Sequence, residues 1–376
     1  MDYLNNSPCF ALYHNQTFSQ TKLLKKGVRM TSKKEMEKEK SRLVRPFFQI
    51  ICIVVTMVTI SLAISKRFGF SRIHDPYDTP EIITPQKIKE FSGYPNRVTV
   101  GLNIDQFHKF SMSKNEFVFS GTLWFLMNPG SISLNTLDNF EFSRGEILYK
   151  SKPNTRMVDN KLLVEYKIRV QFTSPLTYRS FPVGDHRLNL TLTHQSLSLG
   201  EIIFESTEKH FINTTNMRER GWMAINKTVD AGYKTTKLED SPTGMLYRPT
   251  VTFSIDYSRK DVRYLISIFI PLLLMFFIGL FSFSTSRSVA IRITNGVIAA
   301  TLAYRFVIEN MAPSVGYFML TDYLFLLFLF LNFLTFLVIM TDSFAIHISR
   351  RAKMIFIVTL HAIVIATCIY LFLVWS

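Results

Sequence analysis

Four long apolar segments in the last third of the chain constrain its fold more than any other feature. They are Tyr264–Ser284, Val289–Ile308, Tyr317–Met340 and Met354–Trp375. A helix that crosses a bilayer needs about 20 consecutive apolar residues, and each segment has roughly that length. Short connections join them. We therefore predict a transmembrane domain of four helices within residues 259–376.

The second of these segments differs from the others because it carries charged and polar residues. Arg292, Asn295, Arg305 and Glu309 all lie between Ser288 and Pro313. Steps of four and three residues place a single stripe along the predicted helix: Ser288, Arg292, Asn295, Ala299, Leu302 and Phe306. A charge in hydrocarbon costs several kcal/mol or more, so this stripe must face protein or water. We interpret it as the lining of a pore.

The positive charge of the chain is concentrated beside apolar segments. The formal net charge is +15, and much of the excess lies before residue 46 or in Arg350, Arg351 and Lys353. The positive-inside rule accounts for both groups. No nucleic-acid-binding motif accompanies them, so we expect no nucleic-acid partner.

The first 65 residues are predicted to form a basic segment followed by a signal peptide or a signal anchor. Residues 47–64 are apolar, and Ala63 and Ser65 supply the small residues that a signal peptidase requires. Both alternatives send the following region across the membrane. Residues 66–95 contain several prolines and are predicted to be a linker with one short helix, Pro85–Glu90.

Between residues 96 and 258 the hydrophobic period changes to two. Apolar and polar residues alternate in Arg97–Ile104, Lys161–Phe172, Arg187–Thr193 and Arg248–Tyr257, and Glu116–Met127 is also strand-like. Short amphipathic strands joined by turn-rich loops favour an antiparallel β-sandwich. The predicted fold class is thus a membrane protein with an immunoglobulin-like antiparallel β-sandwich outside the cytoplasm, followed by a four-helix transmembrane bundle.

Several classes of site are not expected. The three cysteines, Cys9, Cys52 and Cys368, lie outside residues 66–260, and no metal-binding spacing occurs among the cysteines and histidines. We find no nucleophile–base pair and no paired carboxylates in the apolar segments. The chain is therefore expected to be no enzyme and to need no metal or other cofactor.

The order of these features resembles the pentameric ligand-gated ion channels, also called the Cys-loop receptor superfamily. Phe181-Pro182, followed by Asp185 and an alternating strand, is similar to the family's turn between strands six and seven, although Gly184 stands at the usual aspartate position. Arg263 with Pro271, and the run from Ile308 to Pro313, resemble the first membrane helix and the outer end of the pore helix. The missing flanking cysteines and the short connection Asp342–Lys353 match prokaryotic members.

The resemblance implies a homopentamer in which a ligand binds between neighbouring β-domains and opens a central pore. Residues of the turn and of the helix ends would couple binding to opening: Phe181, Pro182, Asp185, Arg263 and Pro313. The implied partners are copies of the same chain, a small-molecule or proton ligand, permeating ions and membrane lipids. The implied location is the inner or plasma membrane.

If Arg292 faces the lumen, each subunit contributes one guanidinium to a ring, which predicts anion selectivity. Two other readings remain: burial against a carboxylate of a neighbouring helix, or extension toward the lipid headgroups. Ala299 and Ala303 are small, so we expect the constriction at Arg292 or Phe306.

Candidate ligand-binding residues are Thr193, His194, Trp222, Tyr233 and Tyr247. Aromatic rings would hold a cationic amine, while a histidine such as His194 or His186 would respond to protons; a proton or a small anion is as plausible a ligand as an amine. Trp124 is expected in the core. The function predicted from sequence is a subunit of a ligand-gated ion channel. The alternative is a non-conducting membrane receptor or scaffold of the same fold.

Overall fold

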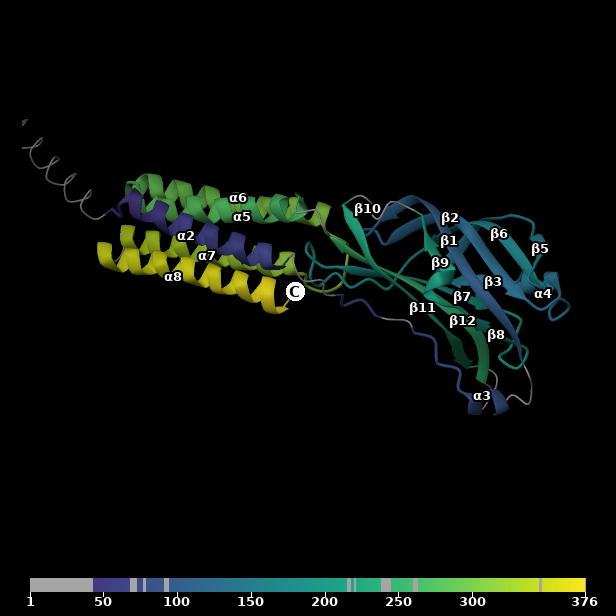
Figure 1. The fold of residues 1–376 in the computed structure, drawn as a ribbon. Coiled ribbons are helices and arrows are strands. Elements are labelled where there is room, and N and C mark those ends of the chain that lie inside the picture. Colours follow the sequence, from purple (N-terminus) through teal and green to yellow (C-terminus); the bar gives the residue numbers. More distant parts are fainter. Residues whose placement is uncertain are drawn as a thin grey trace, which may run out of the picture. The chain divides into compact units, whose positions relative to one another are not determined.

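The computed structural model describes residues 43–67, 73–76, 79–90, 95–214, 218–219, 221–237, 245–259, 263–344 and 347–375. The basic segment predicted before residue 43 lies outside this part of the chain. The chain divides into two units (Figure 1). The helical unit contains residues up to Leu62, Pro271–Tyr304 and Phe325–Ile369, and the β-rich unit contains Ala63–Ile270, Arg305–Leu324 and Tyr370–Ser376.

The first sheet of the β-rich unit has seven strands. Its central path runs β4 (Gly145–Lys150), β6 (Lys161–Phe172), β2 (Glu116–Met127), β1 (Asn96–Ser111) and β8 (Ile202–Glu205), while β5 (Asn154–Val158) pairs with β6 and β9 (Phe211–Asn213) pairs with β1. β1 runs parallel to both β8 and β9, and its pairing with β2 is antiparallel. The sheet is therefore mixed.

The second sheet has five strands and is antiparallel throughout. Its order is β10 (Arg218–Glu219), β11 (Trp222–Lys237), β12 (Met245–Arg259), β7 (His186–His194) and β3 (Phe140–Ser143). Two short helices, α4 (Leu134–Leu137) and η1 (Glu208–His210), lie in the connections of the unit. The side chain of Ser133 caps α4 by accepting a bond from the Thr136 amide.

One hydrophobic core takes side chains from both sheets. Alternate residues of β2 are buried, as the period-two pattern requires. Phe119 of β2, Leu190 of β7 and Phe253 of β12 belong to the same buried cluster and are 0–2% exposed. Burying one such side chain stabilises the fold by about 1.5–3 kcal/mol.

The other face of β7 and β12 is polar and yet buried. Ser254 donates to Asn189 Oδ1 over 2.8 Å, and the hydroxyls of Thr191 and Thr252 lie 3.1 Å apart. The segment between α2 and β1, which includes the short helix α3 (Pro85–Glu90), contacts this sheet (Figure 1). Asn189 Nδ2 donates to the Pro76 carbonyl over 3.2 Å. The carbonyl of Pro76, in the segment between α2 and β1, thus satisfies a buried side chain of this sheet that water would otherwise bond.

Five long apolar helices supply the residues of the helical unit. They are α2 (Pro46–Arg67), α5 (Arg263–Phe281), α6 (Arg287–Met311), α7 (Leu320–Phe344) and α8 (Arg350–Ile369), with the 3₁₀ helix η2 (Ser282–Ser284) after α5 and the π-helix η3 (Tyr370–Trp375) after α8. All five are long and apolar enough to cross a membrane. The chain is therefore treated as a membrane protein.

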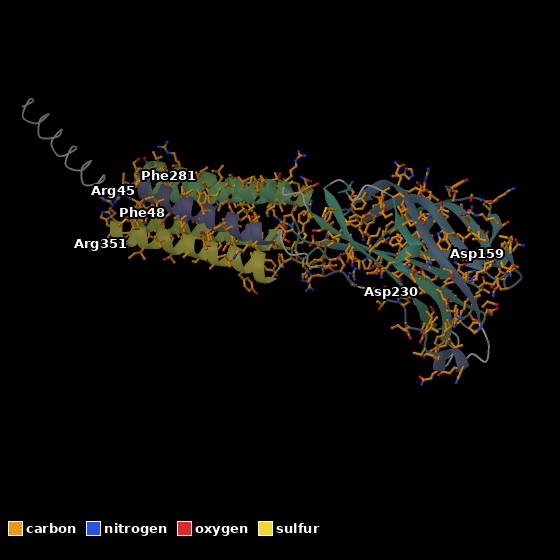
Figure 2. All side chains as sticks on the ribbon, in the orientation of Figure 1. Arg45, Phe48, Asp159, Asp230, Phe281 and Arg351 are labelled. Carbon is orange, nitrogen blue, oxygen red and sulfur yellow. The ribbon has the colours of Figure 1, made fainter. Side chains whose placement is uncertain are left out.

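Helix α2 packs against the other helices through polar side chains. Gln49 is 1% exposed and donates from Nε2 to the Leu280 carbonyl over 2.9 Å. Thr56 Oγ1 lies 2.7 Å from Nδ1 of buried His361 on α8. The amide of Val44, just before α2, donates to the Phe283 carbonyl over 3.2 Å. The start of α2 therefore lies at the end of α5, the same end as the labelled Arg45 and Arg351 in Figure 2.

The fold class predicted from sequence, an antiparallel immunoglobulin-like β-sandwich followed by a four-helix bundle, is wrong. The parallel pairing of β1 with β8 and β9 makes the first sheet mixed. The apolar segment 47–64 forms a fifth long helix, α2, and its Gln49 and Thr56 have buried partners on α5 and α8. Hydrophobicity alone shows that a segment is apolar, and it does not show what that segment packs against.

Candidate functional site

The stripe predicted on α6 is exposed along its whole length. Leu302 and Phe306 are 49% and 70% exposed, and the other members are exposed too: Ser288, Arg292, Asn295 and Ala299. The opposite face of the helix is buried and includes Ala290, Val297 and Ile308. The sequence periodicity therefore identified which face of α6 the chain itself leaves uncovered.

Arg292 lies on this exposed face. Its Nε donates over 3.3 Å to the carbonyl of Ser288, one turn earlier on the same helix. Among the described residues it forms no ion pair, so the alternative in which a carboxylate of the same chain buries it does not apply.

Buried hydroxyls hold the inner face of α6. Thr301 is 0% exposed and donates to the Val297 carbonyl over 2.8 Å, while its oxygen accepts from Asn332 Nδ2 of α7 over 3.2 Å. Thr294 donates in the same way to the Ala290 carbonyl. The Asn332–Thr301 bond joins this face of α6 to α7, and the bonds to Val297 and Ala290 satisfy the buried hydroxyls within the helix.

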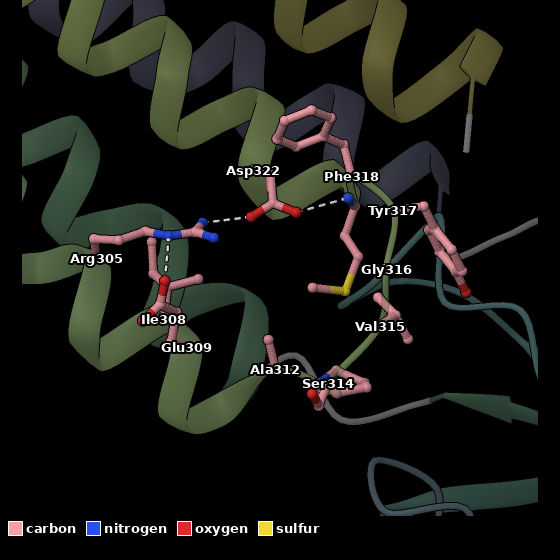
Figure 3. A pocket seen from close by; sticks show the side chains of 12 residues that line it. Arg305, Ile308, Glu309, Ala312, Ser314, Val315, Gly316, Tyr317, Phe318 and Asp322 are labelled. Atoms are coloured by element: carbon pink, nitrogen blue, oxygen red, sulfur yellow. Dashed lines mark hydrogen bonds and ion pairs between the residues drawn. The ribbon is translucent and has the colours of Figure 1, made fainter.

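The connection between α6 and α7 surrounds a cavity of about 600 Å³ (Figure 3). Arg305 donates from Nε to Glu309 over 2.9 Å and from Nη1 to Asp322 on α7. The second oxygen of Asp322 accepts from the Met319 amide over 2.7 Å. Arg305 thus pairs with Glu309 one turn away on α6, and Asp322, which is 4% exposed, is a buried second partner. Pro313, one of the residues predicted to take part in coupling, is buried and lines this cavity.

The turn that contains Phe181, Pro182 and Asp185 is buried and holds an arginine. The backbone N–H of Arg259 donates to Asp185 Oδ1, and its Nη1 donates to the Pro182 carbonyl, each over 3.0 Å. The guanidinium carbon lies 5.9 Å from the centre of the Phe181 ring. Arg263, the basic residue that the sequence predicted to take part in coupling, begins α5 and is exposed.

Two further rings enclose the same guanidinium. The carbon of Arg259 lies 4.3 Å from the centre of the Tyr264 ring and 5.0 Å from that of Trp222. The cavity beside them has a volume of about 190 Å³. A cation enclosed by aromatic faces is attracted to their negative π-clouds, and burial strengthens the attraction. Trp222 therefore contacts a cation of its own chain.

Residues at the start of the same turn contact the α6–α7 connection. The amide of Tyr178 donates to the Tyr317 hydroxyl over 2.9 Å, and the amide of Leu320 donates to the Arg179 carbonyl over 2.8 Å. Burial, together with the nearby Asp75 and Tyr317, raises the pKa of Tyr178. The Tyr178 hydroxyl stays protonated and donates to the Met112 carbonyl over 2.5 Å. These bonds join the turn to the α6–α7 connection and to the first residue of α7.

Four of the five residues predicted to bind a ligand lie at one end of the second sheet. Thr193 and Tyr233 are both next to β12, opposite Thr250 and Pro249 respectively. The rings of Tyr233 and Tyr247 lie 5.7 Å apart in an edge-to-face arrangement. Trp222 begins β11, and at about 3.3 Å per residue it lies roughly 36 Å along the strand from Tyr233. Trp222 therefore does not belong to the same site.

Lys87 of α3, in the segment between α2 and β1, lies over the ring of Tyr247, one of the two paired tyrosines. Lys87 Nζ lies 4.6 Å from the centre of the Tyr247 ring. Glu81 and Tyr233 exchange backbone bonds of 2.8 and 3.0 Å, which hold the segment against β11. A Cβ on Gly232 would lie 2.2 Å from the Glu81 carbonyl oxygen, so this close approach depends on glycine. Sequence reasoning missed Lys87 because its separation from Tyr247 along the chain gives no local signal.

His194 is fully buried and uses both ring nitrogens. Nε2 donates to the Thr136 carbonyl over 2.8 Å, while Nδ1 accepts from the amide of Leu197 over 3.1 Å. Burial lowers the pKa of His194, and the bond to Thr136 opposes that effect. The neutral His194 ring therefore bonds α4 to the connection that follows β7.

No protein-family model matches the sequence, and no curated protein matches it either. The roles of the α6 stripe, the Phe181–Asp185 turn and the tyrosine pair therefore depend on their geometry.

Proposed function

We propose that this chain is the subunit of a homopentameric ligand-gated ion channel whose pore is lined by the exposed stripe of α6. The exposed position of Arg292 and Asn295 on a helix long enough to cross a membrane carries the proposal. Lipid is a poor solvent for a guanidinium, and association of several copies around a water-filled axis removes the stripe from lipid. Arg292 from each copy would then form a cationic ring that attracts anions.

The contacts of the β-rich unit support a route from ligand to pore. A ligand that binds better to the open conformation shifts the equilibrium toward it. The turn around Phe181 is held by Arg259 and reaches Tyr317 and Leu320 through Tyr178 and Arg179. A movement of this turn would be passed to the α6–α7 connection and from there to α6. The proposed ligand is a proton, a small anion or an organic cation.

We place the protein in the inner or plasma membrane with the β-rich unit outside the cytoplasm. Arg45, Arg287, Arg350 and Arg351 flank the ends of apolar helices, which the positive-inside rule assigns to the cytoplasm. The bonds of Gln49 and Thr56 support retention of α2 as a fifth membrane helix, and therefore favour the anchor over the cleaved leader.

The test is current recording from the full-length protein in planar bilayers with a chloride gradient and steps from about pH 7.5 to about pH 5. The expected reversal potential lies near that of chloride for the wild type and moves toward zero for Arg292→Ser. Arg169→Ser, an exposed arginine on β6, is the matched control and should leave the reversal potential unchanged. A sodium-selective current would contradict anion selectivity. Absence of any current under all conditions would favour the non-conducting receptor.

A further inference from the structure

The loop Thr177–Arg187 connects the two sheets and has no covalent closure. It follows β6 and runs into the beginning of β7. The cysteines of the chain are Cys9, Cys52 and Cys368, so none lies in or beside this loop. Yet residues near both of its ends are held in place. Closing a flexible loop costs conformational entropy, so some interaction must compensate for that cost.

The carboxylate of Asp75 bonds to both ends of the loop. Oδ1 accepts from the Thr177 amide over 2.5 Å, and Oδ2 accepts from the Arg187 amide over 2.7 Å. Nδ1 of His186 lies 3.0 Å from Oδ2. The Asp75 side chain is 0% exposed. Bonds from N–H groups to an ionised carboxylate are stronger than bonds between neutral groups.

The position of Asp75 is set by its own neighbours along the chain. Ile73 forms a parallel β-bridge with Asp185, and the Pro76 carbonyl accepts from Asn189 Nδ2 over 3.2 Å. The guanidinium of Arg187 is engaged elsewhere, because its Nε donates to Asp256 Oδ1 over 2.5 Å. Asp75 therefore binds the backbone of Arg187 and not its charge.

The loop that Asp75 closes contains the two residues that reach the α6–α7 connection. Tyr178 directly follows Thr177, and its amide donates to the Tyr317 hydroxyl. The ring of His186, which contacts Asp75, packs 5.3 Å from Tyr178 and 5.4 Å from Trp222. Displacement of the Thr177 end of the loop would therefore move Tyr178 and Arg179 as well.

We propose that Asp75, from the segment before β1, is a positioning residue that closes the Thr177–Arg187 loop as a non-covalent staple. Asp75 thereby sets the positions from which Tyr178 and Arg179 contact the α6–α7 connection. The closure itself is independent of any activity, whereas the consequence for opening of the pore rests on the function proposed above. A segment that precedes the sheets in sequence thereby becomes part of the coupling route.

The closure is tested by hydrogen exchange on the full-length protein in nanodiscs, read at single-residue level for the amides of Thr177 and Arg187. In the wild type the Thr177 amide should exchange far more slowly than a free peptide amide, although it lies outside helices and strands. In Asp75→Asn both amides should exchange about tenfold faster or more, because each loses a bond to a charged acceptor. Asp105→Asn, an exposed aspartate on β1, should leave both rates unchanged.

Either of two exchange results would overturn the staple. One is a Thr177 amide that exchanges at the free-peptide rate in the wild type. This outcome is measured without any variant, so it does not depend on whether Asp75→Asn folds. The other is a folded Asp75→Asn protein with unchanged rates at both amides.

The consequence for opening is tested by single-channel recording over a series of voltages in one fixed chloride gradient, with the open probability compared at a single voltage. Asp75→Asn should change the open probability and leave the unitary conductance and the reversal potential as they are in the wild type. A purely structural role would lower the number of channels without altering their open probability. If the Thr177 and Arg187 amides of Asp75→Asn exchange faster and the open probability is unchanged, the coupling role is overturned, whereas closure of the loop by Asp75 is supported. If the wild type carries no current, the proposed function fails, and the exchange result still decides the staple.

Discussion

The ammonium nitrogen of Lys87 lies 4.6 Å from the centre of the Tyr247 ring, so a cation of the chain itself covers an aromatic face. Tyr247 and Tyr233 form the aromatic pair at which an amine ligand was predicted. The Glu90 carboxylate lies 2.8 Å from the Lys87 ammonium and raises the pKa of the lysine through its hydrogen bond. The lysine is charged at neutral pH with or without this partner. An external cation that uses this face must displace Lys87.

Replacement of Lys87 by methionine should therefore raise the affinity of the tyrosine pair for a small organic cation. The expected gain for tetramethylammonium, used as the probe, is about two- to fivefold, since an exposed cation–π contact contributes about 0.5–1 kcal/mol. Ligand-observed NMR titration of the full-length protein measures it. Lys89→Met removes an exposed lysine from the same short helix and serves as the control. Equal affinities for the two variants would show that Lys87 does not compete for this face.

His194 should make the β-rich unit less stable in acid. Burial lowers its pKa in the folded state, whereas the unfolded chain titrates near about 6.5. Between these two values the unfolded state binds more protons, so stability rises with pH and is lost as pH falls below about 6.5. Protonation would also place an N–H at Nδ1 opposite the amide of Leu197.

The measurement for His194 is the thermal unfolding midpoint between about pH 7.5 and about pH 5. His194→Asn retains an acceptor near the position of Nδ1 and should flatten the pH dependence, even though its midpoint at neutral pH is lower. His108→Asn changes an exposed histidine on β1 and should preserve the wild-type slope. A slope that survives in His194→Asn would assign the acid sensitivity to another group.

The sequence predicted the strongly periodic elements and missed those that depend on distant partners. β6 and β12 alternate clearly and were found, as were the strand-like segment that forms β2 and the short helix α3. β11 gives no clear alternation because many of its residues are polar, and it is held by pairing with β12 along its length. The parallel pairing of β1 with β8 and β9 joins segments about a hundred positions apart, and no local pattern reports it.

In the candidate site, too, the sequence predicted the periodic feature and missed the contacts that depend on distant partners. The exposed stripe of α6 follows from spacing alone, since a helical period determines which residues share a face. The partners of Arg259 and Asp75 could not be read from the sequence, because burial and hydrogen bonding with distant residues define the roles of both. For Asp322 a signal existed: it is a carboxylate within an otherwise apolar segment, and such a residue needs a buried partner.

The hydroxyl of Thr301 should stabilise the contact between α6 and α7. Thr301→Val removes the acceptor for Asn332, a residue that is 2% exposed. Hydrogen bonds between membrane helices contribute about 0.6 kcal/mol on average and up to about 1.7 kcal/mol, so a loss in this range is expected. Thermal unfolding in detergent measures it, with Thr341→Val as the control, because the exposed Thr341 bonds only to Leu337 of its own helix. Equal midpoints for the two variants would show that the Thr301–Asn332 bond contributes nothing measurable.

Arg305 provides an internal comparison, because two carboxylates of different exposure bind the same guanidinium. The side chain of Glu309 is 53% exposed and lies one turn away on α6, while that of Asp322 is 6% exposed and comes from α7. Glu309→Gln should lower the free energy of unfolding by only about 0.2–0.5 kcal/mol, the usual contribution of an exposed pair four residues apart. Asp322→Asn should lower it by about 1–3 kcal/mol, because the Met319 amide and the arginine both lose a charged, buried acceptor. Chemical denaturation of both single variants and of the double variant gives the coupling between the carboxylates. A Glu309→Gln effect as large as that of Asp322→Asn would mean that the exposed pair, and not the bond across to α7, holds the outer end of α6.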